Sequence, residues 1–328
     1  MTQIRIEVLY IGGAGRSGST LISQLIGSLD GYISVGELNS SWENCFLKNR
    51  LCGCGQPFRV CAFWQTVLEE AFGGIERVDV QHMLALRQAT QRGKALLYLL
   101  APRLRSEEFQ AQLREHSAAI EAIYQAVHKV SGCSVIVDAS KSARYGVMVA
   151  EIPGVQAKML HLVRDSRAVA HSWTRRKRRT DVTIAEEYMS QYSPLASAKQ
   201  WNTAQMLSSI TARRFTASTL YRYEDFVAEP RRALSDMLQR LGMDVPAASP
   251  FLTDHEVRLA DDHSLCGNPS RFDRGPIVIR PDSEWTQQMP GKEKSQVTLL
   301  TLPWLLKYGY LTSGGTVVGK SRPRVASH

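Results

Sequence analysis

A glycine-rich turn between an apolar strand and a helix is the feature that most constrains the fold of this chain. The run IRIEVLYIGG (4–13) is apolar enough for a buried strand, and GSTLISQLIGSL (18–29) carries leucines four residues apart on one helical face. The stretch GGAGRSGST (12–20) joins the two. This order predicts a phosphate-binding loop, because loop N–H groups and a helix N-terminus both attract anions.

The loop departs from the nucleoside-triphosphate pattern at one place. That pattern has a lysine and then Ser or Thr after its second glycine, whereas Gly18 is followed directly by Ser19. The only cation of the loop is Arg16, whose planar guanidinium can donate two parallel hydrogen bonds to one phosphate group. We therefore predict an anion site formed by the glycines and donors of the loop: Gly13, Gly15, Arg16, Ser17, Gly18, Ser19 and Thr20.

Short β-rich runs alternate with helical patterns along the rest of the chain. The patterns predict strands at 133–140, 157–165 and 217–225 and helices at 62–73, 78–92 and 107–130. This alternation predicts a three-layer, P-loop-like α/β fold with a central, mostly parallel sheet flanked by helices. We expect one domain over 1–310, a helical insertion with cysteines at 38–130, and a flexible Gly/Ser/Arg-rich tail at 311–328.

A second candidate motif is LHLVRDSRAVAHSW (160–173). Ligands bind beyond the carboxyl ends of parallel strands, and Arg164 follows such a strand, with Ser172 two helical turns further on. The pair is suited to hold a second phosphate group. The alternative is that Arg164 pairs with a carboxylate.

The charge balance favours an anionic partner. The chain has 40 Lys and Arg against 31 Asp and Glu, a formal net charge of +9. The densest basic run, RRKRR (175–179), is either a solvated face or an attractant for an anionic ligand, and we find no motif of a nucleic-acid-binding surface. No run approaches the roughly 18 apolar residues that span a bilayer, and we find no signal peptide. We expect a cytoplasmic protein without a membrane span.

Four of the six cysteines lie close together in CFLKNRLCGCGQPFRVC, at Cys45, Cys52, Cys54 and Cys61. Such a group is consistent with a structural zinc site, with two disulfides, or with reduced cysteines that act as small apolar side chains. The eight histidines show no metal-ligand spacing, and we assign them no chemistry. No catalytic metal is expected.

Together, GGAGRSGSTL and LVRDSRAVAHSW resemble the sulfotransferases that use 3′-phosphoadenosine 5′-phosphosulfate (PAPS) as donor. Further similar stretches follow in the same order: VGEL (35–38), VDASKS (137–142), YRYEDF (221–226) and GNPSRFDRG (267–275). The similarity runs from about residue 8 to 290. It resembles the bacterial, tyrosylprotein and carbohydrate branches, in which the loop carries arginine, more than the cytosolic members with lysine there.

The resemblance implies roles for the matched positions. The loop would bind the 5′-phosphosulfate, with Arg16 stabilising charge on the leaving phosphate. Arg164 and Ser172 would hold the 3′-phosphate, and Tyr223 would contact adenine. Three residues resemble a late loop that closes over the 3′-phosphate, although the usual Arg-Lys-Gly run is missing: Arg271, Arg274 and Gly275.

The resemblance also implies two catalytic side chains besides Arg16. Glu37 of SVGEL matches a glutamate that serves as base, and Lys141 of VDASKS matches a lysine that contacts the transferring group. Alternatively, Glu37 caps a helix or pairs with a nearby arginine. Asp138 is a second candidate base, and it is equally placed to pair with Lys141.

The implied reaction is in-line transfer of a sulfuryl group from PAPS to a hydroxyl group of a small molecule or carbohydrate, without a metal, leaving 3′,5′-ADP (PAP). The alternative is a P-loop phosphotransferase or other nucleotide-binding enzyme, against which the missing lysine counts. A third hypothesis is an anion-binding protein without catalytic activity.

Overall fold

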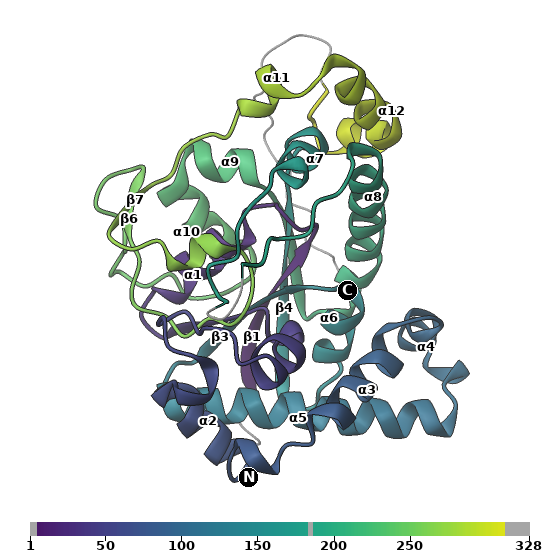
Figure 1. The fold of residues 1–328 in the computed structure, drawn as a ribbon, viewed down its shortest axis with the longest axis vertical. Helices are drawn as coiled ribbons and strands as arrows, with labels where there is room; N and C mark the ends of the chain where they lie inside the picture. Colours follow the sequence, from purple (N-terminus) through teal and green to yellow (C-terminus); the bar gives the residue numbers. More distant parts are fainter. Residues whose placement is uncertain (1–4, 183–185, 312–328) are drawn as a thin grey trace.

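Five parallel strands form the central sheet of the structure, a computed structural model that describes residues 5–182 and 186–311 (Figure 1). Their order across the sheet is β2-β3-β1-β4-β5. The strands are β1 (Ile6–Gly13), β2 (Tyr32–Gly36), β3 (Val135–Lys141), β4 (Val155–Val163) and β5 (Ala217–Arg222). The predicted parallel α/β sheet is therefore confirmed.

Helices cover both faces of this sheet, which gives the three layers. One face packs against α1 (Ser19–Gly27), α9 (Tyr223–Ala228) and α10 (Pro230–Arg240), and the other against α5 (Glu107–Ser131), α6 (Ala143–Ala150) and α8 (Pro194–Thr211). The alternation of side chains along β1 explains this division: Leu9 and Ile11 face the first group, and Val8 and Tyr10 the second.

The remaining elements pack on these layers. Helices α2 (Ala62–Phe72) and α3 (Val80–Gln91) pack on α5, and α12 (Gly291–Lys307) packs on α7 (Ser166–Thr174) and α8. The other elements are α4 (Ala95–Leu100), α11 (Glu284–Gln288), and the antiparallel pair β6 (Glu256–Arg258) and β7 (Pro276–Val278). Short 3-10 or π turns occur at η1 (Leu38–Ser40), η2 (Trp42–Leu47), η3 (Phe58–Val60), η4 (Ile75–Arg77), η5 (Pro102–Leu104), η6 (Ala212–Arg214) and η7 (Pro269–Phe272).

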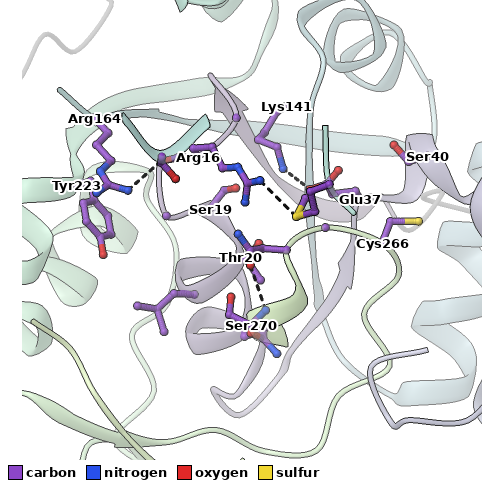
Figure 2. A pocket seen from close by; sticks show the side chains of 18 of the residues that line it. Arg16, Ser19, Thr20, Glu37, Ser40, Lys141, Arg164, Tyr223, Cys266 and Ser270 are labelled. Atoms are coloured by element: carbon purple, nitrogen blue, oxygen red, sulfur yellow. Dashed lines mark hydrogen bonds and ion pairs between the residues drawn. The ribbon is translucent and has the colours of Figure 1, made fainter. Parts of the chain in front are cut away.

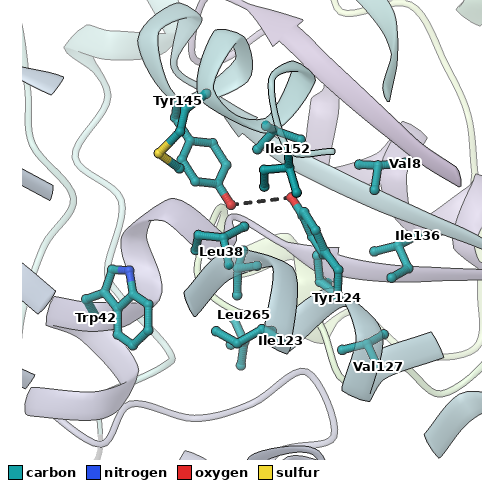
Figure 3. Close-up of a cluster of buried hydrophobic side chains, with 14 of the residues drawn as sticks. Val8, Leu38, Trp42, Ile123, Tyr124, Val127, Ile136, Tyr145, Ile152 and Leu265 are labelled. Atoms are coloured by element: carbon teal, nitrogen blue, oxygen red, sulfur yellow. Dashed lines mark hydrogen bonds between the residues drawn. The ribbon is translucent and has the colours of Figure 1, made fainter. Parts of the chain in front are cut away.

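The apolar side chains of α5, in the helical middle region of the chain, pack into the core between α5, α6 and the sheet. This apolar stripe is buried, and Figure 3 shows Ile123, Tyr124 and Val127 of α5 beside Ile136 of the sheet. The region 38–130 was expected to be an insertion, yet its last helix, α5, covers one face of the sheet.

Other differences are local. The strand β2 was not predicted, and the predicted strand 217–225 ends at Arg222, where α9 begins. All but the first residue of the expected tail 311–328 lies outside the described residues. Within the described part of the chain, no helix combines the length and apolar character needed to cross a bilayer.

The parallel register brings the carboxyl ends of all five strands to one edge. Gly12 pairs with Lys141, Gly13 with Leu162, Gly36 with Asp138, and Val163 with Arg222. Each strand therefore ends at or just before one candidate residue: the loop after Gly13, Glu37, Lys141, Arg164 and Tyr223. This edge carries the candidate site.

Candidate active site

A pocket of about 480 Å³ lies at the carboxyl edge of the sheet. Ten of the predicted site residues line it: Gly15, Arg16, Gly18, Ser19, Thr20, Glu37, Lys141, Arg164, Ser172 and Tyr223. They come from the first loop and the start of α1, from the ends of β2, β3 and β4, from the last turn of α7 (Ser172) and from the start of α9 (Tyr223). The edge of the sheet thus collects residues that are up to about two hundred positions apart in the chain.

Two glycines of the loop are required by the backbone and its neighbours. Gly13 has φ 123° and Gly18 has φ 84°, both in the region that disfavours side chains. A Cβ atom at Gly18 would collide with the ring of Tyr223, and one at Gly13 with the carbonyl oxygen of Leu162. The loop therefore packs directly on the strand and ring beside it, and α1 begins immediately after it at Ser19.

The side chain of Arg16 is largely buried without a carboxylate partner. Its guanidinium lies 4.6 Å from the centre of the Trp173 ring, and Nη2 lies 3.3 Å from Sδ of Met189. Among the described residues, no Asp or Glu forms an ion pair with it. Burial lowers the pKa of Arg16, while the charge of Glu37 opposes that shift. A cation that is partly shielded from water and has no carboxylate partner attracts an anionic ligand.

Glu37 and Lys141 form an ion pair inside the pocket. Lys141 Nζ lies 2.5 Å from Oε1 of Glu37 and also donates to the carbonyl of Ala139 at 3.0 Å. Figure 2 shows both side chains directed toward the same space as Arg16. The backbone N–H of Glu37 donates to Leu265 O at 2.7 Å, which fixes the point from which the carboxylate projects. A carboxylate and an ammonium group in contact suit proton transfer next to a developing negative charge.

Asp138, the other candidate base, forms hydrogen bonds in the protein core and not in the pocket. It is fully buried and accepts hydrogen bonds from Ser140 and from the hydroxyls of Tyr124 and Tyr145, at 2.7 and 3.2 Å for the two tyrosines. Figure 3 shows the two hydroxyls meeting inside the core. Burial raises the pKa of Asp138, and these hydrogen bonds oppose the rise. It does not pair with Lys141 and does not line the pocket. Its contacts hold the end of β3 in place.

Arg164 pairs with a carboxylate, which is one of the two contacts that the sequence left open. Its Nη2 pairs with Asp282 at 2.7 Å, its Nη1 donates to the backbone carbonyl of Arg16 at 3.1 Å, and its guanidinium lies 4.8 Å from the centre of the Tyr223 ring. Burial alone would raise the pKa of Asp282, but the hydrogen bond and charge of Arg164 lower it. Arg164 thus lines the pocket beside an aromatic face while holding the loop.

The structure does not bring Arg271, Arg274 and Gly275 to the pocket. The Arg271 side chain is 1% exposed and donates to the carbonyls of Leu51 and Cys266 at 2.6 and 2.9 Å. Arg274 donates to Gly53 O and to Arg271 O. Both guanidinium groups therefore tie the late loop to the cysteine segment. The same loop lines the pocket through other residues, namely Gly267, Asn268, Ser270 and Asp273.

The cysteines also differ from the expected group of four. All six are free thiols in the structure, which therefore does not contain the two disulfides that were one of the three alternatives. Cys45 lies apart from the others, with its sulfur 3.7 Å from that of Cys266. Cys52, Cys54 and Cys61 meet His263 instead. The sequence assigned no chemistry to the histidines, whereas His263 lies among three cysteines in an arrangement that could hold a metal ion.

Several pocket residues were not identified from the sequence. Arg179 of the basic run lines the pocket and pairs with Asp181 at 2.7 Å, so that end of the run is not a solvated face. Trp173 directly follows Ser172 and packs on Arg16. Ser40 and Asn44 reach the pocket from the turns after Glu37. For Arg179 the only signal in the sequence was the density of the basic run. That density did not show which of its side chains points into the pocket.

The fold and pocket define a class of α/β proteins in which a glycine-rich loop after the first strand lines a pocket at the carboxyl edge of a parallel sheet. A family model described as the sulfotransferase family matches residues 9–247. The chain therefore belongs to the sulfotransferase family and is a sulfotransferase enzyme.

Solved structures of similar fold are distant in sequence. The sulfotransferase domain of the Synechococcus PCC 7002 olefin synthase is 19% identical, with 92% of this chain and 95% of that chain covered and a TM-score of 0.47. The sulfotransferase domain from the curacin biosynthetic pathway is 14% identical, with 92% and 97% covered and a TM-score of 0.47. The sulfotransferase STF1 from Mycobacterium tuberculosis H37Rv is 12% identical, with 75% and 70% covered and a TM-score of 0.34. No curated protein matches the chain.

Proposed function

We propose that this sulfotransferase moves the sulfuryl group of PAPS to a hydroxyl group of a small molecule or carbohydrate. One observation supports the proposal most: the half-buried guanidinium of Arg16, which has no carboxylate partner among the described residues, lies in a pocket that also holds the ion pair of Glu37 and Lys141. A cation that faces an anionic donor and a carboxylate next to the reacting atoms are the two groups that this transfer needs.

The loop and the start of α1 would hold the phosphosulfate. Ser19 and Thr20 line the pocket at the helix N-terminus, where backbone N–H groups and the helix dipole favour anions. The hydroxyl of Ser17 is buried and has no hydrogen-bond partner among the described residues, but Ser17 does not line the pocket, so we assign it no contact with the phosphate. Arg16 would neutralise the charge that grows on the phosphate as the sulfur–oxygen bond breaks.

Glu37 and Lys141 would act on the acceptor side. As the acceptor oxygen bonds to sulfur, the bond from sulfur to the phosphate oxygen breaks, the acceptor proton passes to Glu37, and PAP leaves. Lys141, now paired with Glu37 at 2.5 Å, would turn to an oxygen of the transferring group and free the carboxylate to accept the proton. Ser40 and Asn44 extend the pocket beyond this pair and would contact the acceptor.

The nucleotide half of PAPS would lie toward α7 and α9. Arg164 and Ser172 would bind the 3′-phosphate, and the ring of Tyr223 would contact the adenine. Arg164 already pairs with Asp282. It would therefore bind the 3′-phosphate either together with Asp282 or in place of it. Arg271, Arg274 and Gly275 have no part in this binding unless the late loop rearranges, since none of the three residues lines the pocket.

Thermal shift with three ligands tests the proposal, because a specific ligand raises the apparent stability by mass action. We expect PAP to raise the melting temperature more than ATP with Mg²⁺ does, and an oligonucleotide to leave it unchanged. A larger effect of ATP with Mg²⁺ would instead indicate a P-loop phosphotransferase. A shift with the oligonucleotide alone, lost as salt rises, would indicate non-specific anion binding.

A further inference from the structure

Three cysteines and one histidine converge on a small site outside the pocket. The sulfur of Cys61 lies 3.7 Å from that of Cys52 and 3.6 Å from that of Cys54, and the Nδ1 atom of His263 lies 3.3 Å from Cys61 and 3.7 Å from Cys52. All four ligand atoms lie within 4.8 Å of one another. The histidine is about two hundred residues away in the sequence, so the fold creates this cluster.

The distances fit a tetrahedral metal ion and not a disulfide. With metal–sulfur bonds of about 2.3 Å, two sulfurs on a tetrahedral zinc lie about 3.8 Å apart, and a sulfur and an imidazole nitrogen slightly closer. Four of the six separations, 3.3 to 3.7 Å, match those edges. The other two, from Cys54 to Cys52 and to His263, are at most 4.8 Å. A disulfide needs about 2.05 Å, and no two of these thiols are bonded.

The surroundings hold the histidine in a fixed orientation. The imidazole of His263 stacks on the ring of Phe63, with ring centres 4.6 Å apart and planes at 13°. The indole N–H of Trp64 donates to the backbone carbonyl of His263 at 2.8 Å. The backbone N–H of Gly53 donates to Ser264 O at 2.9 Å. A ligand that is oriented by its neighbours is typical of a metal site.

We propose that Cys52, Cys54, Cys61 and Nδ1 of His263 bind one Zn²⁺ ion as a structural site. The three thiols give up their protons to solvent as the ion binds, and the neutral imidazole supplies the fourth ligand. Four protein ligands leave no position for water or substrate, which separates this site from catalytic zinc. The set excludes Cys45, whose sulfur contacts Cys266.

The zinc site would fix one wall of the active pocket. It joins the cysteine segment to residue 263, and two residues later Leu265 pairs its backbone with Val35 and Glu37 at 2.9 and 2.7 Å. The next residues, Cys266 and Gly267, line the pocket. Metal binding would therefore position the backbone of Glu37 and the late loop. The metal site itself is independent of which donor the pocket binds.

Metal analysis of tag-free protein, purified with reductant, tests the proposal directly. We expect about one zinc per chain. Replacement by Co²⁺ should give the visible bands of a tetrahedral ion together with a thiolate-to-cobalt band in the near ultraviolet. Iron instead of zinc, or folded protein that has its thiols reduced and contains no metal, would overturn the assignment. So would an oxidised pair among Cys52, Cys54 and Cys61.

Variants then test the ligand set. Cys54→Ser and His263→Ala change half-buried side chains, and each should lower the zinc content about tenfold or more. His263→Cys should keep the metal and strengthen the thiolate-to-cobalt band. Cys45→Ala is the matched control, because it removes a neighbouring cysteine outside the set and should keep zinc at the wild-type level. Loss of zinc in Cys45→Ala, or its retention in both Cys54→Ser and His263→Ala, would contradict the proposed ligands, with circular dichroism showing that each variant is folded.

Discussion

At the scale of single residues, Arg16 and Arg164 differ in what surrounds them. Arg16 has an aromatic face and a thioether for neighbours, whereas Arg164 has the carboxylate of Asp282. The first cation is therefore available for charge that develops during the reaction. The second is part of a fixed network that connects the loop, Tyr223 and Asp282.

This difference predicts separable effects of two substitutions. Arg16→Ala should lower kcat by about tenfold to a thousandfold, because it removes a group that stabilises the transition state. It should weaken PAP binding much less than it lowers kcat, because the backbone N–H groups of the loop still hold the 5′-phosphate of PAP. Arg164→Ala should weaken PAP binding about tenfold, because it removes a contact made in the ground state. Calorimetric titration with PAP and steady-state kinetics measure both, and exchanged phenotypes would mean that the two roles are assigned the wrong way round.

At the scale of elements, the turn from β1 to α1 depends on the contact between Gly18 and Tyr223 of α9. Both the left-handed backbone of Gly18 and the close approach of the ring require glycine. This packing connects the phosphate loop to the residue expected to contact adenine.

Gly18→Ala should therefore cost more than backbone strain alone. Gly31 is a matched control, since its φ of 80° is nearly that of Gly18 and no atom lies within 4 Å of a Cβ built there. Gly31→Ala should destabilise the fold by about 1 kcal/mol, from strain only. Gly18→Ala should add the displacement of Tyr223 and weaken PAP binding. Urea denaturation and PAP titration test this, and equal behaviour of the two variants would show that the ring contact is unimportant.

The elements also show what could be predicted from the sequence. The ends of β1, β3 and β4 follow from apolar runs that stop at polar residues, and this put Arg16, Lys141 and Arg164 at one edge of the sheet. The strand β2 was missed because YISVG is short, although its following residue, Glu37, was identified by resemblance. The direction of a long side chain is set by tertiary contacts, so the placement of Arg271 against Leu51 and Cys266 could not be read from the pattern SRFDRG. His263 meets the cysteines only through the fold.

At the scale of the whole molecule, two buried histidines link stability to pH. His116 and His161 lie in the interior, bonded to Thr90 and to Gln205, and burial lowers the pKa of each to about 4. The unfolded chain takes up these protons near pH 6.5. Between about pH 6.5 and pH 4 the unfolded state therefore binds more protons than the folded state, so stability falls as the pH is lowered through this window.

We expect each histidine to reduce the free energy of unfolding by roughly 1 kcal/mol per pH unit below pH 6.5. Urea denaturation from pH 7 to pH 5 measures this slope. His116→Leu removes one titrating group and should reduce this slope by roughly 1 kcal/mol per pH unit, the contribution of one histidine. A free energy of unfolding that does not change between pH 7 and pH 5 would show that both histidines protonate as readily in the folded state.

The most direct measurement is transfer of label from radiolabelled PAPS to a panel of hydroxyl acceptors, by wild type and Glu37→Gln in parallel. The wild type should form a labelled product and PAP in equal amounts. The variant should bind PAP as tightly as the wild type but lose about a hundredfold or more in kcat, because the acceptor proton has no base. Normal transfer by Glu37→Gln would contradict the role of this carboxylate. A wild type that neither binds PAP nor labels any acceptor would contradict the assignment of this pocket to PAPS.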